Sequence, residues 1–194
     1  MSGPVRRRTR ARESALQYLY MMEVRGHEAE EELDAFVEHQ TKASRDPRGR
    51  GEIAAFTKEL CQGIPENRLE LDQWIEAIAR NWRLDRMALV DRNVLRLALY
   101  ELIFHPDTPY KVVINEAIEI AKRFSTAQSG SFVNGILDRA RILIEDARAA
   151  SDGHPVPPKT AAPALKPEPR PRQEVAPDSL FSPPVPRPRR REDS

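Results

Sequence analysis

Apolar residues along the chain recur at the spacing of amphipathic helices. Between residues 110 and 124 they return every three or four positions, while lysine, arginine and glutamate fill the positions between them. After the six-residue break STAQSG the same spacing resumes at Phe132 and continues to Ala147. The two segments predict a helical hairpin in which the second helix packs back against the first.

Five further segments carry the helical period, at residues 10–25, 28–41, 53–64, 69–82 and 88–104. Pro65 is expected to interrupt the helix before it, and residues 43–51 are expected to form a loop because of their proline and glycine content. No stretch alternates apolar and polar residues for long enough to predict a strand. The pattern therefore predicts an all-α bundle of six or seven helices.

Three positions carry more than packing requires. Asn115 lies within an apolar run, and Asn134-Gly135 places a glycine inside a helix, where it costs about 1 kcal/mol relative to alanine. These positions suggest a close approach or a polar partner. Glu101 lies on an apolar helix face, so we expect it to be paired, with Arg92, Arg96 or a helix N-terminus.

Composition divides the chain into three parts. Twelve of the 17 prolines fall in residues 151–194, which hold few large apolar residues. Such a segment buries too little surface to offset its ordering entropy, so we expect residues 149–194 to be a disordered Pro/Arg-rich tail. Residues 10–148 are the expected helical domain, and residues 1–9 the expected flexible arginine-rich arm.

The formal net charge of +1 conceals a strong partition. The first twelve residues carry five arginines and no acid, residues 13–150 carry a net charge of −6, and the tail carries +2. A basic arm on an acidic body favours contact with a polyanion, and we expect RNA or DNA.

Chemistry for catalysis is not evident in the sequence. Cys61 is the single cysteine, the four histidines lack ligand spacing, and the eight glycines form no phosphate-binding loop. Glu116 and Glu119 have no histidine partner, and the serines have no identifiable base. We therefore expect no catalytic residue, cofactor or metal, and a binding protein instead of an enzyme. No apolar run reaches about 18 residues and no signal peptide is recognisable, so a cytoplasmic protein without a membrane contact is expected.

Four separated blocks, in the right order, resemble the NusB transcription antitermination factor family. They are RARESALQYLY (10–20), VDRNVLRLALYEL (90–102), PYKVVINEAIEIAKRF (109–124) and SFVNGILD (131–138). The resemblance implies two three-helix bundles set across one another. It also implies binding to the boxA element of ribosomal RNA transcripts jointly with NusE, a ribosomal protein of the small subunit. The resulting complex with RNA polymerase resists termination, and family members also aid maturation of the rRNA.

The resemblance also implies site residues. The RNA-binding set comprises Arg6, Arg7, Arg8, Arg10 and Arg12 in the arm, with Tyr110, Lys111, Lys122, Phe132 and Asn134 in the hairpin. Asp91, in place of an expected glutamate, and Gln128 are the expected contacts to the protein partner. Two residues depart from the family pattern: Gln128 stands in place of Asp in an A-x-D-S loop, and Ser131 stands where Lys often precedes Phe-Val-Asn-Gly.

Two alternatives differ in class from an antitermination factor. The helical body also resembles the RNA-binding domain of rRNA methyltransferases, but only the proline-rich tail follows it where such an enzyme carries an α/β cofactor-binding domain. The second alternative is a helical protein-interaction adaptor in which the arginine arm is incidental.

Overall fold

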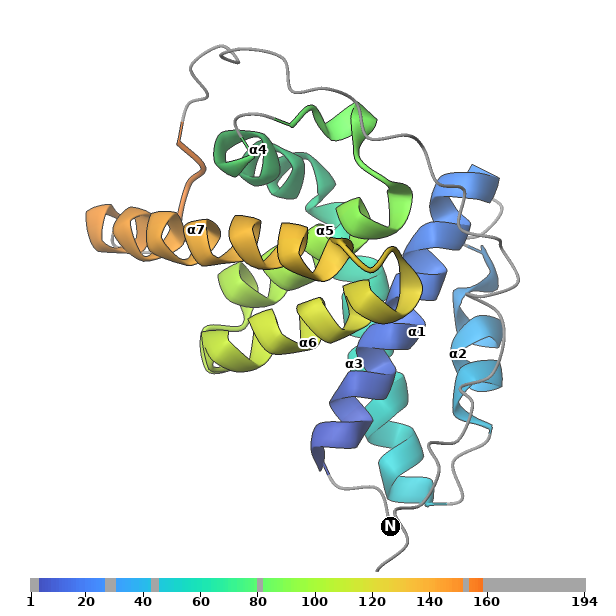
Figure 1. The fold of residues 1–194 in the computed structure, drawn as a ribbon. Coiled ribbons are helices and arrows are strands. Elements are labelled where there is room, and N and C mark those ends of the chain that lie inside the picture. Colours follow the sequence, from blue (N-terminus) through green and yellow to red (C-terminus); the bar gives the residue numbers. More distant parts are fainter. Residues whose placement is uncertain (1–3, 27–30, 43–45, 80–81, 152–153, 159–194) are drawn as a thin grey trace, which may run out of the picture.

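The computed structural model describes residues 4–26, 31–42, 46–79, 82–151 and 154–158. These residues form seven α-helices and one short 3₁₀ turn, η2 (Leu84–Arg86), and contain no strand (Figure 1). The helices are α1 (Pro4–Arg25), α2 (Leu33–Thr41), α3 (Pro47–Glu66), α4 (Arg68–Ile78), α5 (Leu89–Phe104), α6 (Tyr110–Phe124) and α7 (Ser129–Ala150). The all-α prediction is confirmed.

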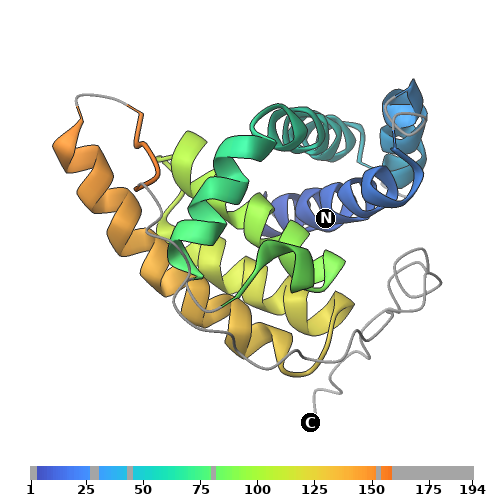
Figure 2. The same ribbon diagram turned by 90° about the horizontal axis from the view of Figure 1, so that it is seen from above.

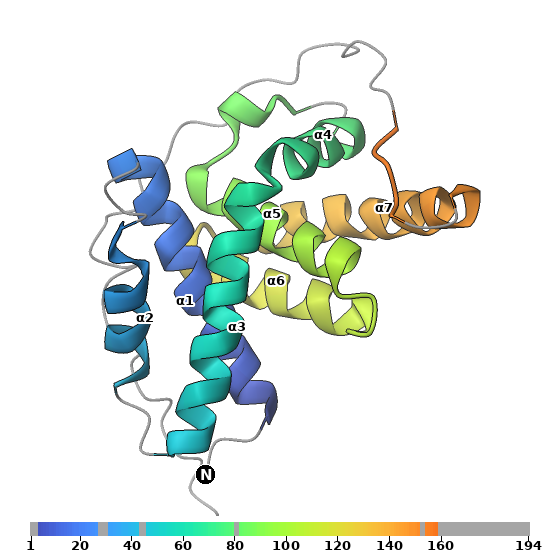
Figure 3. The same ribbon diagram turned by 180° about the vertical axis from the view of Figure 1, so that it is seen from behind.

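The helices form two groups that cross one another. In the first group α1 lies along α3, with α2 beside both, and in the second group α6 and α7 form the expected hairpin against α5, with α4 packed on α5 and α7 (Figures 1 and 3). Helix α5 lies between the groups and contacts α1 and α3 as well. Thirteen of its 16 residues are buried, so it is the central element of a continuous apolar core.

The flexible arm predicted for residues 1–9 is wrong for residues 4–9, because α1 already begins at Pro4. Arginine is a good helix former, and proline is well tolerated in the first helical turn. Ion pairs from Arg7 to Asp46 and Glu52 also tie this turn to α3 and the residue before it. The arm is therefore the first turns of a helix, and residues 1–3 lie outside the described part of the chain.

Helix α3 departs from prediction at both ends. It begins at Pro47, so the predicted loop is wrong for residues 47–51, because proline favours the first helical position. At the other end α3 continues through Pro65 to Glu66. Gly63 allows a close approach here: a Cβ on Gly63 would lie 2.0 Å from the hydroxyl oxygen of Tyr100 on α5.

The chain turns back onto the body after α7. The ring of His154 lies 4.9 Å from that of Phe104, its Nε2 lies 2.6 Å from a carboxylate oxygen of Glu70, and Pro155 is buried. Figure 2 shows this segment returning beside the end of α5. The prediction of a disordered tail from residue 149 is therefore wrong for residues 149–151 and 154–158, while residues 159–194 lie outside the described residues.

Candidate nucleic-acid interface

Two arginines of the arm are exposed at the start of α1. Arg6 is exposed, and Arg8 is exposed with its guanidinium carbon 4.7 Å from the centre of the Phe56 ring. Stacking on an aromatic face orients the guanidinium and leaves its N–H groups available to an acceptor. The N-terminal end of a helix adds its own partial positive charge. Arg6 and Arg8 are therefore placed to meet phosphate.

Arg7 and Arg10 are engaged within the chain. Arg7 donates to Asp46 at 2.9 Å and to Glu52 at 2.7 Å, and the Glu52 hydrogen bond raises the pKa of Arg7. Arg10 donates to the backbone oxygen of Gln40 at 3.1 Å. Both side chains are half-buried, so their positive charge is partly committed to holding α1 against the rest of its helical group.

Arg12 does not belong to an exposed RNA-binding surface. Its side chain is 2% exposed and donates two hydrogen bonds of 2.7 Å to the carboxylate of Glu101, which is fully buried. A further ion pair of 3.4 Å joins it to Glu116 on α6. Burial acts to lower the pKa of Arg12, but the hydrogen bonds and charges of Glu101 and Glu116 together outweigh burial, and the pKa of Arg12 is raised. The prediction of an RNA contact is wrong for Arg12 in this conformation, because its side chain is buried and its guanidinium group is bound to Glu101.

The pairing predicted for Glu101 is confirmed, but its expected partners were wrong. Arg92 and Arg96 pair instead with Glu23 of α1, and Arg96 also pairs with Asp72 of α4. The sequence carried a signal for the true pair, because Arg12 lies three and four positions before Ala15 and Leu16 on the apolar face of α1. Two opposite charges on apolar helix faces are expected to pair, because a buried charge without a partner is unfavourable.

The loop end of the hairpin gathers three of the predicted hairpin residues. The exposed Lys122 lies across the buried Gly130, where an added Cβ would lie 2.8 Å from the lysine Cγ. The half-buried ring of Phe132 meets Trp82 edge-on, with the ring centres 5.2 Å apart. The amide of Asn134 donates to Asp138 at 3.2 Å. We call this region, residues 122–134 with Trp82, the loop end.

The expectation of a close approach at Gly135 is not met within the described chain. No atom lies within 4 Å of a Cβ added at Gly135, which is exposed beside Asn134 on α7. Asn115 is also exposed, on α6. Packing of the described residues therefore does not require a glycine here.

The other two predicted hairpin residues lie at the opposite end of α6. The ring of Tyr110 carries the guanidinium of Arg141 at 4.8 Å, and Lys111 Nζ lies 6.0 Å from the same ring. Arg141 follows Phe132 by nine residues, about 13 Å along α7. The structure thus divides the predicted hairpin surface into two ends.

Asp91 does not reach the surface as the predicted partner contact requires. It is 6% exposed and accepts a 3.0 Å hydrogen bond from the hydroxyl of Ser129, which in turn accepts the backbone N–H of Thr126 at 3.2 Å. Asp91 therefore lies below the surface, where its hydrogen bond to Ser129 holds the turn between α6 and α7. Gln128, the last residue of that turn and the N-cap of α7, is exposed and can contact a partner directly.

Sequence reasoning missed Trp82 and Ser129. The apolar pattern includes Trp82 only as the last residue of a predicted helix, and the sequence identifies no companion for Ser129. In the structure Trp82 contacts the Phe132 ring edge-on and Ser129 donates to Asp91. An aromatic pair separated by 50 residues leaves no periodic signal. Ser129 is the first residue of the helix that contains Phe132, and its partner Asp91 lies 38 residues away, so no local pattern pairs the two.

The described residues contain no group of three or more His, Cys, Asp or Glu side chains that could hold a metal ion. Among the helices of the described chain, none combines the length and apolar character needed to cross a membrane.

Comparison with known proteins shows the family to which the chain belongs. The NusB family model matches residues 9–141. The transcription antitermination protein NusB of Anaeromyxobacter dehalogenans (strain 2CP-1 / ATCC BAA-258) is 47% identical over 142 residues, which cover 73% of this chain and 95% of that protein. The NusB of Myxococcus xanthus (strain DK1622) is 45% identical over 139 residues, covering 71% and 96%.

Solved structures agree with the sequences. One, described as antitermination factors NusB and NusE in complex with dsRNA, has a TM-score of 0.60 at 28% identity and covers 71% of this chain and 97% of its own. The T. maritima NusB has a TM-score of 0.59 at 40% identity, covering 73% and 93%. Because the family model spans more than half of the sequence and the relatives are covered almost end to end, the chain belongs to the NusB family.

Proposed function

We propose that this chain is an RNA-binding transcription antitermination factor. It binds the boxA element of ribosomal RNA transcripts together with NusE and so helps RNA polymerase to resist termination. The observation that carries the proposal is the match to NusB proteins at up to 47% identity over nearly their whole length. A related NusB of the same fold has been solved with NusE and RNA. The role is non-enzymatic and belongs to the cytoplasm.

RNA phosphates are met by the exposed start of α1. Arg6 and Arg8 supply the cations, and Arg8 is already oriented by the Phe56 ring. Arg7 and Arg10 contribute less, because their guanidinium groups are bound to acceptors within the chain. Phosphate contacts of this kind position the RNA without reading its sequence.

Bases are read at the loop end. Phe132 offers a half-buried ring supported by Trp82, on which an unpaired base can stack. Asn134 offers an amide that can pair with a base edge, and Gly135 beside it leaves room for close approach. Lys122 adds a cation at the same end. Tyr110 and Lys111 extend the surface at the far end of α6.

NusE is met next to the loop end. Gln128 makes direct contact, and Asp91 acts through Ser129 by fixing the turn that presents Gln128. A turn held by buried hydrogen bonds binds without a large ordering cost.

A gel shift with labelled boxA RNA, performed with and without NusE, tests the assignment. The expected result is a shift for boxA RNA that NusE strengthens, and a weaker shift for a scrambled RNA of equal length. Equal affinity for the two RNAs at several salt concentrations, unaffected by NusE, would instead support an interaction adaptor with an incidental basic arm.

A further inference from the structure

A cavity of about 170 Å³ lies between the end of α1, the junction of α3 and α4, and α5. Its walls are apolar where Leu19, Met22, Ile64 and Pro65 line it. An engineered cavity of about 150 Å³ accommodates benzene, so this one has room for a single aromatic ring. The cavity is therefore large enough to take one apolar side chain.

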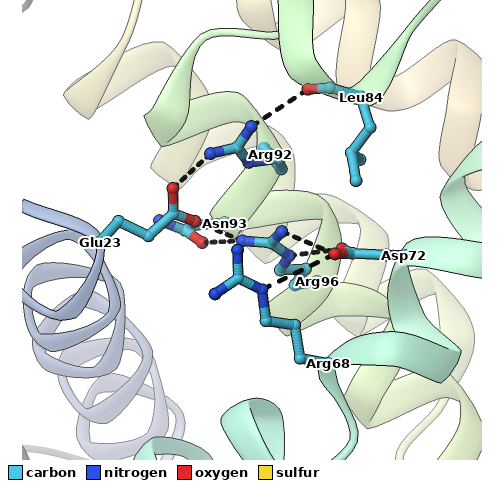
Figure 4. A network of polar contacts seen from close by, with 7 residues as sticks. All are labelled: Glu23, Arg68, Asp72, Leu84, Arg92, Asn93 and Arg96. Carbon is cyan, nitrogen blue, oxygen red and sulfur yellow. Dashed lines mark hydrogen bonds and ion pairs between the residues drawn. The ribbon is translucent and has the colours of Figure 1, made fainter. Parts of the chain in front are cut away.

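Glu23, Arg68 and Arg96 line one side of the cavity and belong to a network of polar contacts, which Figure 4 shows. Arg96 binds both oxygens of Asp72, at 2.7 and 2.9 Å, and pairs with Glu23, which also pairs with Arg92. Arg68 is the loosely held member of the network: its Nε lies 3.8 Å from Asp72 and its side chain is 58% exposed. Three arginines thus face two carboxylates, and Arg68 at the rim has donors free for an added anion.

Asn93 is an independent indication that the cavity can bind a ligand, because it presents a buried donor that lacks an acceptor. It lines the cavity and is 1% exposed, and its oxygen accepts a 3.0 Å hydrogen bond from Arg96. Its amide nitrogen has no hydrogen-bond partner in the described part of the protein. A buried donor without an acceptor destabilises the folded state, and a bound peptide brings carbonyl oxygens that can accept its hydrogen bond.

The sequence outside the described residues contains a segment with matching chemistry. Phe181 is the one aromatic residue in residues 159–194; it follows Leu180, and Asp178 precedes it by three residues. The apolar wall of the cavity favours an aromatic ring, and the arginine at its rim favours a carboxylate close to that ring.

The last described residues bring the chain close to this cavity. His154 binds Glu70, which lies two residues from Arg68 in the first turn of α4. From Pro158, 23 residues lead to Phe181 and can span up to about 75 Å. A tethered segment binds at an effective concentration in the millimolar range, so even a weak contact is populated.

We propose that the chain binds its own residues 178–181 in this cavity, with the ring of Phe181 between α1 and α3 and the carboxylate of Asp178 on Arg68. The contact places a strap across the boundary between the two helical groups.

Photo-crosslinking in the full chain tests the strap. Leu180 is replaced by p-benzoylphenylalanine, which leaves the ring of Phe181 free to enter the cavity, and the irradiated protein is mapped by mass spectrometry. The expected crosslinks lie within one molecule, on residues 19–26 or 64–68. The matched control carries the same photoreactive residue in place of Leu165, which lies in the same tail but outside residues 178–181. The control protein should form no crosslinks to residues 19–26 or 64–68.

Charge exchange supplies the second arm. Arg68→Glu should reduce the crosslinking yield several-fold, and adding Asp178→Arg should restore it. Circular dichroism verifies the fold, and Arg68→Gln provides a milder variant if Arg68→Glu unfolds. Three results would each overturn the proposal: crosslinks on other surfaces, crosslinks between two copies of the chain, or a crosslinking yield that does not change with the charge at position 68.

Discussion

Arg12 of α1 and Glu101 of α5 form a doubly hydrogen-bonded ion pair at the boundary between the two helical groups, with both N–O distances at 2.7 Å. The pair is excluded from water, so each charge depends on the other for its solvation. One arginine of the basic arm has therefore become a structural cation.

Removing one member of this pair should be costly. Glu101→Ala leaves the Arg12 guanidinium buried without its main acceptor, and we expect a loss of about 3–5 kcal/mol in the free energy of unfolding. The double variant Arg12→Met with Glu101→Leu should recover most of that loss, because an apolar pair needs no charge compensation. Urea denaturation measures both. A midpoint for Glu101→Ala equal to that of the parent would contradict the buried pairing.

The arginines at the start of α1 should differ in their effect on RNA binding. Arg6→Ala and Arg8→Ala should each reduce the slope of log K against log salt by about 0.7, the value for one lost phosphate contact with single-stranded RNA. Arg7→Ala is the matched control, because Asp46 and Glu52 already bind its guanidinium. Fluorescence anisotropy across a salt series measures the slopes. A loss at Arg7 as large as that at Arg8 would mean that the internal ion pairs open when RNA binds.

Phe132 and Asn134 should affect binding strength and discrimination differently. Phe132→Leu keeps an apolar contact with Trp82 but removes the stacking ring, and should cost about 1–3 kcal/mol of RNA affinity. Asn134→Ala should reduce the preference for boxA over scrambled RNA, with little change in salt slope. Competition gel shifts measure both, with circular dichroism as the folding control. A Phe132→Leu variant with parental affinity would place base stacking elsewhere.

The turn between α6 and α7 should respond differently to two neighbouring substitutions. Ser129→Ala removes the donor to Asp91 and leaves that carboxylate buried, so we expect a loss of stability of about 1–3 kcal/mol and weaker binding to NusE. Gln128→Ala changes an exposed side chain and should alter stability by less than about 0.5 kcal/mol while weakening NusE directly. Thermal melts and calorimetric titration with NusE separate these effects. Full NusE affinity in both variants would argue that this turn is not the contact.

Two truncations should separate the packed segment after α7 from the remainder of the tail. Ending the chain after Pro158 keeps His154 and Pro155 in place and removes only the weak tethered contact of residues 178–181. Such a contact is worth about 0.4 kcal/mol when the effective concentration equals its Kd, so the melting temperature should fall by no more than about 2 °C. Ending it after Ala150 removes a buried proline and an aromatic contact to Phe104. If these contribute about 1 kcal/mol, the melting temperature falls by about 2–4 °C. Identical melting temperatures for the two truncations would show that the segment adds no stability.

Helical periodicity predicted the fold because burial repeats along each helix. The hairpin of α6 and α7 and the central α5 follow directly from their apolar positions. Helix ends were less predictable, since Pro47 and Pro4 lie inside the first turns of helices whose following residues are largely polar. A polar helical turn held by ion pairs, like the one at Arg7, has no apolar pattern to reveal it.

The candidate site was only partly predictable for a related reason. Charge counting identifies the arm but cannot distinguish Arg8, stacked on Phe56, from Arg12, enclosed with Glu101. That distinction depends on how α1 crosses α5, which is a tertiary property. Asp91 illustrates the same limit, because its partner Ser129 lies 38 residues away.

The helical start of α1 bears on the thermodynamics of RNA capture. Because Arg8 is fixed on Phe56 and Arg7 anchors the same turn, these cations need little ordering when RNA arrives. A disordered basic arm would instead fold on binding, with a large negative heat-capacity change and a substantial entropic penalty. Calorimetry at several temperatures should therefore give the modest heat-capacity change of a preformed surface.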